Sequence, residues 1–215
     1  TDPSFIQGMG KLQKDLLSTE PKLQILQSCA ANNIHVTMNQ LTLKNDEELK
    51  RAIEVVKAFE ANDFQALATG VTMKLGGFDH FNKKVLFVKV KGEGGAVGDD
   101  PLNAMFQALQ TRFTEANLNP KSAGAGFKAH LTVCKAPQGK GKNRPSIPNS
   151  VFERVKELEG TIEGEQVMNS LVFCVKRLGH EDTPPVLYNI SLQSILPSFY
   201  FAHQVQQIYS FTTNV

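Results

Sequence analysis

Apolar residues recur every three or four positions in four stretches of the chain, and this spacing predicts four amphipathic helices. The first begins after Asp2-Pro3, and the last is a short helix over residues 149–158. The two helices between them have recognisable starts: Asn45 stands three residues before a glutamate, and Asp100 precedes a proline at the first helical position. Such side chains favour a helix start because their oxygen accepts a free backbone N–H.

Runs of β-branched and apolar residues between these helices predict strands, which cover residues 33–43, 68–75, 84–91, 127–134, 168–176, 186–196 and 200–209. Gly76-Gly77 and the aromatic residues after it are expected to form the loop between the second and third strands. The order helix, strand, helix and two strands occurs once in each half of the chain. It predicts an α+β fold of two lobes, each a mainly antiparallel sheet with helices outside.

The composition indicates the class of protein but not its binding partner. The 215 residues are 41% hydrophobic, typical of a soluble globular protein, and the net charge of +2 leaves any phosphate affinity to a local patch. Cys29, Cys134 and Cys174 cannot all pair and match no zinc or redox spacing, which fits a reducing compartment. Without a signal peptide or a membrane span, we expect an intracellular protein of the cytoplasm or nucleus.

Two His-x-Thr tripeptides, His35-Val36-Thr37 and His130-Leu131-Thr132, are the sharpest chemical features of the sequence. Residues two apart on a strand point to the same face, so each tripeptide presents an imidazole beside a hydroxyl. The residue between them faces the packed side. By the same alternation, Lys128 and Cys134 fall on the face of His130, and Cys134 is interpreted as packing.

This pair of motifs suits the cleavage of a phosphodiester. An attacking hydroxyl or water needs a base on one side of the phosphorus and an acid on the other. Imidazoles titrate near neutrality and can hold opposite protonation states, while threonine hydroxyls can donate to the charged phosphate oxygens. The sequence offers no evident metal-ligand cluster, so neither a metal nor a cofactor is expected.

The paired motifs resemble the two-histidine (2H) phosphoesterase superfamily, and residues 34–48 and 127–137 are most similar to its A-kinase-anchor-protein branch. Residues 75–81 and 85–90 also fit that pattern, and the resemblance extends from about Ile6 to Ile195. It implies a single bilobal domain over 1–215, with pseudo-twofold symmetry and a central cleft. It also implies that His35 and His130 are the acid–base pair and that Thr37 and Thr132 bind the phosphate.

The sequence departs from the family pattern in two places. Ala129 stands before the second histidine, where proline is common, which affects backbone stiffness more than chemistry. The family opens with a strand, whereas this chain starts at the first helix. We therefore expect residues 197–215 to supply a strand, centred on Tyr200–Val205, in that place, through permutation or exchange between chains. A larger multidomain parent chain is also expected.

The expected substrates are RNA-type phosphodiesters, either 2′,5′-linked oligonucleotides or 2′,3′-cyclic phosphate ends, and which histidine is the base stays open. Besides Lys128, Phe78 is a candidate for substrate binding, since it or Phe81 could stack on a base. His80 either reaches a base or, as we favour, caps a turn. The alternative function is a non-catalytic module that binds AMP, CMP or RNA. RNA binding could use a basic loop as a phosphate patch, although the same loop could be merely solvated. Its basic residues are Lys135, Lys140, Lys142 and Arg144.

Overall fold

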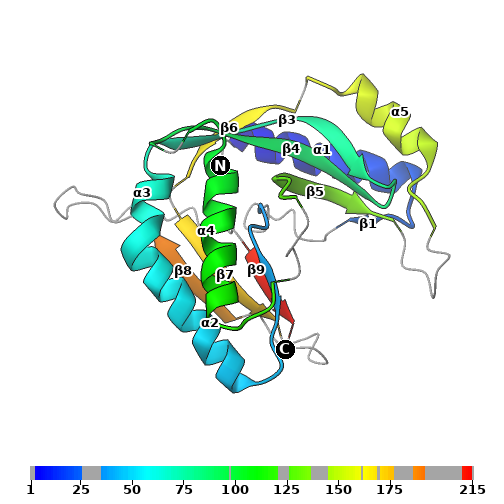
Figure 1. Cartoon of the computed structure of the whole chain (residues 1–215). Helices are drawn as coiled ribbons and strands as arrows, with labels where there is room; N and C mark the ends of the chain where they lie inside the picture. The colour runs from blue at the N-terminus through cyan, green and yellow to red at the C-terminus, as the bar shows by residue number, and fades with distance from the viewer. Residues whose placement is uncertain are drawn as a thin grey trace. The chain divides into compact units, whose positions relative to one another are not determined.

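The computed structural model forms two compact units (Figure 1). It describes residues 3–25, 35–96, 98–120, 126–136, 145–160, 162–168, 170–176, 186–191 and 210–214. Unit 1 comprises Thr1–His35, Met73–Lys91 and His130–Gln166; unit 2 comprises Val36–Thr72, Gly92–Ala129 and Val167–Val215. Among the described residues, no helix combines the length and the apolar character that crossing a bilayer requires.

The four predicted helices are present, and their caps follow from the sequence. They are α1 (Pro3–Thr19), α2 (Asp46–Phe59), α4 (Pro101–Glu115) and α5 (Asn149–Glu157). Asn45 Oδ1 accepts the backbone N–H of Glu48 at 2.9 Å, and Asp100 Oδ1 accepts that of Asn103 at 3.0 Å. Side-chain acceptors at these two positions satisfy N–H groups that the helix itself leaves free.

One helical segment was not predicted from the sequence. After α2 the chain continues through a π-helical turn, η1 (Glu60–Phe64), into α3 (Gln65–Ala68). Phe64 and Ala68 are buried, so the apolar stripe of α2 continues past the end of its regular spacing. The strand predicted from residue 68 therefore begins only at Val71.

Unit 1 contains most of a five-stranded sheet in the order β1-β5-β4-β3-β6. Its strands are β1 (Gln24–Ile25), β3 (Val71–Phe81), β4 (Val85–Gly94), β5 (His130–Lys135) and β6 (Gly164–Val167). The end of β3 at residues 71–72 and that of β4 at residues 92–94 belong to unit 2, as does Val167 of β6. Strand β5 pairs antiparallel with both β1 and β4.

The hairpin between β3 and β4 turns at a different place from the one predicted. Gly76-Gly77 lies within β3, and the turn is made by Asn82 and Lys83, whose φ angles are 49° and 54°. The Lys84 N–H donates to Phe81 O at 2.8 Å, which closes the turn. Two successive positive φ angles are those of a tight hairpin turn whose twist matches the strands, so no glycine loop is needed.

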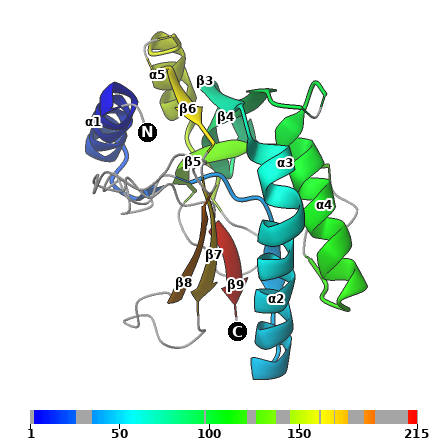
Figure 2. The same cartoon turned by 90° about the vertical axis from the view of Figure 1, so that its left-hand side faces the viewer.

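Helices α1 and α5 lie on the same side of this sheet (Figure 2). An ion pair of 2.8 Å between Arg154 of α5 and Asp15 of α1 joins them. The buried side of α1 is apolar apart from Gln13, and a Cβ at Gly164 of β6 would stand 3.0 Å from Phe5. The helices therefore cover one face of the sheet and restrict functional side chains of this unit to the other face or to the rim of α5.

Unit 2 holds a four-stranded sheet in the order β2-β9-β7-β8. Its strands are β2 (Gln40–Thr42), β7 (Ser170–Lys176), β8 (Val186–Ser191) and β9 (Ser210–Asn214). Helices α2 and α4 belong to the same unit, where Arg112 of α4 forms an ion pair with Asp63 of η1. Two layers of helix and strand in each unit confirm the predicted α+β class.

Strand pairing in this second sheet differs from the mainly antiparallel pattern expected. Among the described strands of this sheet, β7 and β8 are antiparallel, whereas β9 runs parallel to both β2 and β7. A strand that enters between two strands distant in the sequence has no hairpin to fix its direction, so parallel pairing is open to it. This strand belongs to the segment 197–215, but Tyr200–Val205, on which the prediction was centred, lies outside the described residues, and the replacement of an opening strand stays a prediction.

Candidate active site

The second His-x-Thr motif opens β5, and its alternation is as predicted. His130 and Thr132 are half-buried, whereas Leu131 between them is buried. In the antiparallel register His130 lies opposite Lys89, and Thr132 lies opposite Phe87. Directly paired residues share a face of the sheet, so an imidazole, a hydroxyl and an ammonium group stand on one face of unit 1.

Two phenylalanines of the β3–β4 hairpin hold the His130 ring. Its centroid lies 4.9 Å from that of Phe81 in an edge-on arrangement and 5.2 Å from that of Phe87, and the two phenyl rings are 4.4 Å apart. Edge contacts of this kind are favourable and directional. They restrict the orientation of the imidazole while leaving it partly open to solvent. Sequence reasoning considered Phe81 for base stacking and missed Phe87 altogether.

Lys89 is a second functional candidate that sequence reasoning missed. It is exposed, and its stem crosses β3 at Gly77, where a Cβ would stand 2.7 Å from Lys89 Cε. Gly77 has a φ of +67°, a conformation that favours glycine. The Gly76-Gly77 pair, expected to make a loop, therefore leaves room for a lysine on the face of His130. The signal in the sequence was the alternation of β4, which places Lys89 two residues after Phe87.

Because of a β-bulge in β5, Cys134 lies on the opposite face of the sheet from the one predicted. Leu86 pairs with Cys134 but Phe87 pairs with Thr132, so Val133 is an extra residue without a partner in β4. An extra residue reverses the alternation beyond it, which turns Cys134 to the face of Leu86, opposite to His130. Cys134 is fully buried there, and burial raises the pKa of its thiol to about 12. It packs, as expected, but not on the face of His130.

The first His-x-Thr motif keeps its alternation without a long strand. The strand predicted over 33–43 is regular only at β2, and residues before His35 lie outside the described range. Val36 and Met38 are each 2% exposed, while His35 and Thr37 are half-buried. His35 belongs to unit 1, as do His130 and Thr132, whereas Thr37 belongs to unit 2, whose first segment begins at Val36.

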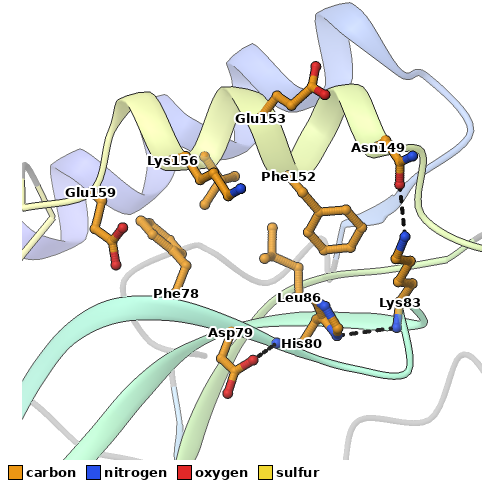
Figure 3. A pocket seen from close by; sticks show the side chains of 11 residues that line it. Phe78, Asp79, His80, Lys83, Leu86, Asn149, Phe152, Glu153, Lys156 and Glu159 are labelled. Atoms are coloured by element: carbon orange, nitrogen blue, oxygen red, sulfur yellow. Dashed lines mark hydrogen bonds between the residues drawn. The ribbon is translucent and has the colours of Figure 1, made fainter.

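Phe78 does not lie with His130. It lines a pocket under α5 together with Leu86, on the opposite face of the sheet from Phe87 (Figure 3). His80 lines the same pocket, and its Nδ1 accepts the Lys83 N–H at 3.4 Å, so it caps the hairpin turn as we favoured. The alternation of β3 explains both positions, because Phe78 and His80 point opposite to Phe81.

Lys128 stands just before β5, which begins at residue 130 and not at 127 as predicted. It is exposed and belongs to unit 2, next to Phe127, whose ring stacks on Phe106 at 4.7 Å. Of the basic loop, Lys135 is exposed, and Lys140, Lys142 and Arg144 lie outside the described residues. In the described part of the chain, no three His, Cys, Asp or Glu side chains form a group that could hold a metal ion.

Comparison with known proteins gives the family. Nine chains of solved structures match, among them the one titled "Crystal Structure of MHV ns2 PDE Domain", which is 12% identical with a TM-score of 0.45 over 63% of this chain and 76% of that one. No curated protein matches. A family model for the AKAP7 2'5' RNA ligase-like domain matches residues 1–190. Because that match spans most of the sequence, the chain belongs to the AKAP7 2'5' RNA ligase-like domain family.

Proposed function

We propose that this protein is a metal-independent phosphoesterase that cleaves RNA-type phosphodiesters with His35 and His130 as its two proton carriers. The observation that carries the proposal is the arrangement on β5. His130 and Thr132 share one partly open face, and two phenyl rings at 4.9 and 5.2 Å hold the imidazole. A histidine that served only packing would not need an adjacent hydroxyl or access to solvent.

The first motif supports the same proposal from a distant part of the sequence. His35 and Thr37 are half-buried, and the apolar residues that alternate with them are buried. Both histidines belong to unit 1. The family match adds a second kind of support, because the family is that of 2'5' RNA ligase-like domains.

The proposed reaction at a 2′,3′-cyclic end is a hydrolysis. One histidine removes a proton from water as its oxygen bonds to phosphorus, and the other donates a proton to the ribose oxygen as its bond to phosphorus breaks. For a 2′,5′ linkage the attacking oxygen belongs either to the neighbouring ribose hydroxyl or to water. In both cases one proton is taken up and one is released, so the pair ends with its protons exchanged.

Charge builds on the non-bridging oxygens during this attack, and hydroxyl or ammonium donors would stabilise it. Thr132 is the donor next to His130, and Thr37 holds the same place beside His35. Lys89 adds a positive charge on the face of His130, and Lys128 is an exposed cation two residues before that histidine. We assign Thr132 and Lys89, which lie in unit 1 with His130, to phosphate binding. For Thr37 and Lys128, which belong to unit 2, the same role stays a prediction from the sequence.

The test is cleavage of a panel of 2′,5′- and 3′,5′-linked oligonucleotides and 2′,3′-cyclic ends in the presence of EDTA. Loss of either catalytic histidine, in His35→Ala or His130→Ala, should lower kcat about 10²–10⁴-fold. His80→Ala is the matched control, since this histidine caps a turn on the opposite face and should leave kcat unchanged. Cleavage that is equal in wild type and in His130→Ala would contradict the proposal.

Two further readouts separate the alternatives. An enzyme with two titrating imidazoles should give a bell-shaped dependence of kcat/KM on pH, and each single variant should lose one limb. Binding of AMP or CMP with no turnover of any substrate in the panel would instead identify a sensing module. Binding of RNA that weakens steeply with salt and needs neither histidine would identify a scaffold.

A further inference from the structure

A second pocket lies in unit 1 between α5 and the β3–β4 hairpin (Figure 3). Its volume is about 460 Å³, within the range of cavities that hold small organic ligands. Leu86 forms its floor, Phe78 rises from β3, and Phe152 descends from α5. Nothing in the proposed phosphoesterase chemistry uses this pocket.

The pocket is separate from the face that carries His130. Leu86 and Phe87 are neighbours on β4, so their side chains point to opposite faces. Phe87 contacts the His130 ring at 5.2 Å, whereas Leu86 lines the pocket. The same alternation in β3 sends Phe81 to His130 and Phe78 to the pocket. A ligand in the pocket would therefore lie on the other side of the sheet from the histidine.

The middle of the pocket suits a flat aromatic group. Phe78 and Phe152 both present rings to it, and an edge contact of 5.0 Å between Phe152 and His80 fixes the second ring. Phenyl rings and an aliphatic floor favour a planar, polarisable guest, and each stacked base typically contributes strongly to binding.

The two ends of the pocket carry different groups, and the carboxylates of Asp79 and Glu153 also line it. At one end Lys83 Nζ donates to Asn149 Oδ1 at 3.0 Å, which leaves the amide N–H₂ of Asn149 as a further donor. In the described part of the chain no carboxylate lies within ion-pair distance of Lys83 in the hairpin turn, whereas Arg154 of α5 pairs with two, Asp15 and Glu157. Glu159 stands at the opposite end beside Phe78 and can only accept hydrogen bonds when ionised.

We propose that this pocket is a second nucleotide site, which takes a nucleoside monophosphate whose base carries an exocyclic amino group. The base lies between Phe78 and Phe152 over Leu86, and its amino group donates to Glu159. The phosphate lies at the end of Lys83 and Asn149, where an ammonium and an amide donate to it. Lys156, which lines the pocket between the two ends, adds positive charge toward the phosphate.

The experiment uses a reporter placed in the pocket. The sequence has no tryptophan, so Phe152→Trp places a single tryptophan at the proposed site, and its emission can be excited selectively at about 295 nm. Titration with 5′-AMP should change its emission with saturation. IMP, which lacks the amino group, should bind about 10-fold more weakly, as expected for one lost charge-assisted hydrogen bond. Adenosine, which lacks the phosphate and its contacts with both Lys83 and Asn149, should bind at least about 10-fold more weakly.

Paired variants locate the site. In the Phe152→Trp background, Lys83→Gln and Glu159→Gln should each weaken 5′-AMP about 10-fold. Lys11→Gln, an exposed lysine on α1, should leave the affinity unchanged, and so should His130→Ala. Lys83→Gln leaves the proposed catalytic site intact. A failure to detect 5′-AMP in the pocket would therefore not count against the proposed phosphoesterase activity, and a lack of phosphoesterase activity would not count against the pocket.

Three results would overturn the proposal. The tryptophan emission does not change with 5′-AMP up to millimolar concentration, Lys83→Gln leaves the affinity for 5′-AMP unaltered, or His130→Ala abolishes the binding of 5′-AMP. If Phe152→Trp does not fold by circular dichroism, calorimetric titration of 5′-AMP into His35→Ala/His130→Ala replaces it. That variant should still bind 5′-AMP and lose about 10-fold on addition of Lys83→Gln, and no heat of binding would refute the site.

Discussion

The buried side chain of Gln13 offers a sharp test of how β5 is held in place. It lies on α1, is 4% exposed, and donates from Nε2 to the backbone oxygen of Val133 at 2.9 Å. Val133 is the bulged residue, without a partner in β4. The helix therefore supplies a hydrogen bond that β4 does not, at the residue that follows Thr132.

Gln13→Met removes this donor and keeps an unbranched side chain of similar length. The Val133 carbonyl then stays buried without its amide partner, which costs about 1–3 kcal/mol. For a chain of 215 residues, a Tm shift of roughly 2–4 °C accompanies each kcal/mol, so Tm should fall by about 2–12 °C. Helix propensity contributes little, since glutamine and methionine are close on that scale.

The assay is thermal unfolding followed by far-ultraviolet circular dichroism, with Gln7→Met measured beside it. Gln7 lies on the same helix but is exposed, so its substitution should change stability by less than about 0.5 kcal/mol. If Gln13→Met melts at the same temperature as Gln7→Met, the hydrogen bond does not support the bulge and the reasoning fails. Phosphoesterase activity of the two variants would then show whether His130 is affected as well.

Three further changes test other parts of the structure. Asn45→Ala should cost about 1 kcal/mol because it removes the cap of α2, and Asn45→Ser should restore most of it in urea unfolding. Gly94→Ala should destabilise the protein by at least about 1–2 kcal/mol, because φ at Gly94 is +78° and the new Cβ would stand 2.6 Å from a backbone oxygen. Gly10→Ala, which adds a Cβ in open space within α1, should stabilise the protein by about 0.5–1 kcal/mol. Equal Tm shifts in the two variants would contradict both expectations. Burial raises the pKa of Cys134 to about 12 from 9.0, so the unfolded thiol ionises first and stability should fall as pH rises from 9.0 toward 12. Cys134→Ala should lose less stability than wild type between about pH 8 and pH 11, and parallel losses would count against a buried neutral thiol.

The sequence determined the elements whose causes are local. The caps at Asn45 and Asp100 are set by side chains within three residues of the N–H groups that they accept, so the starts of α2 and α4 could be predicted. The alternation of His130, Leu131 and Thr132 is a property of an extended backbone, so their faces could be predicted as well. The family resemblance added the chemistry that these patterns suit.

The tertiary structure decided what depends on partners distant in the chain. The bulge at Val133 exists because β4 and α1 meet β5 there, and it moved Cys134 to the other face. The rings around His130 come from a hairpin whose turn lies at Asn82 and not at the glycine pair. Register, bulges and parallel insertion of a strand are set by packing between segments, and no local pattern in the sequence contains that information.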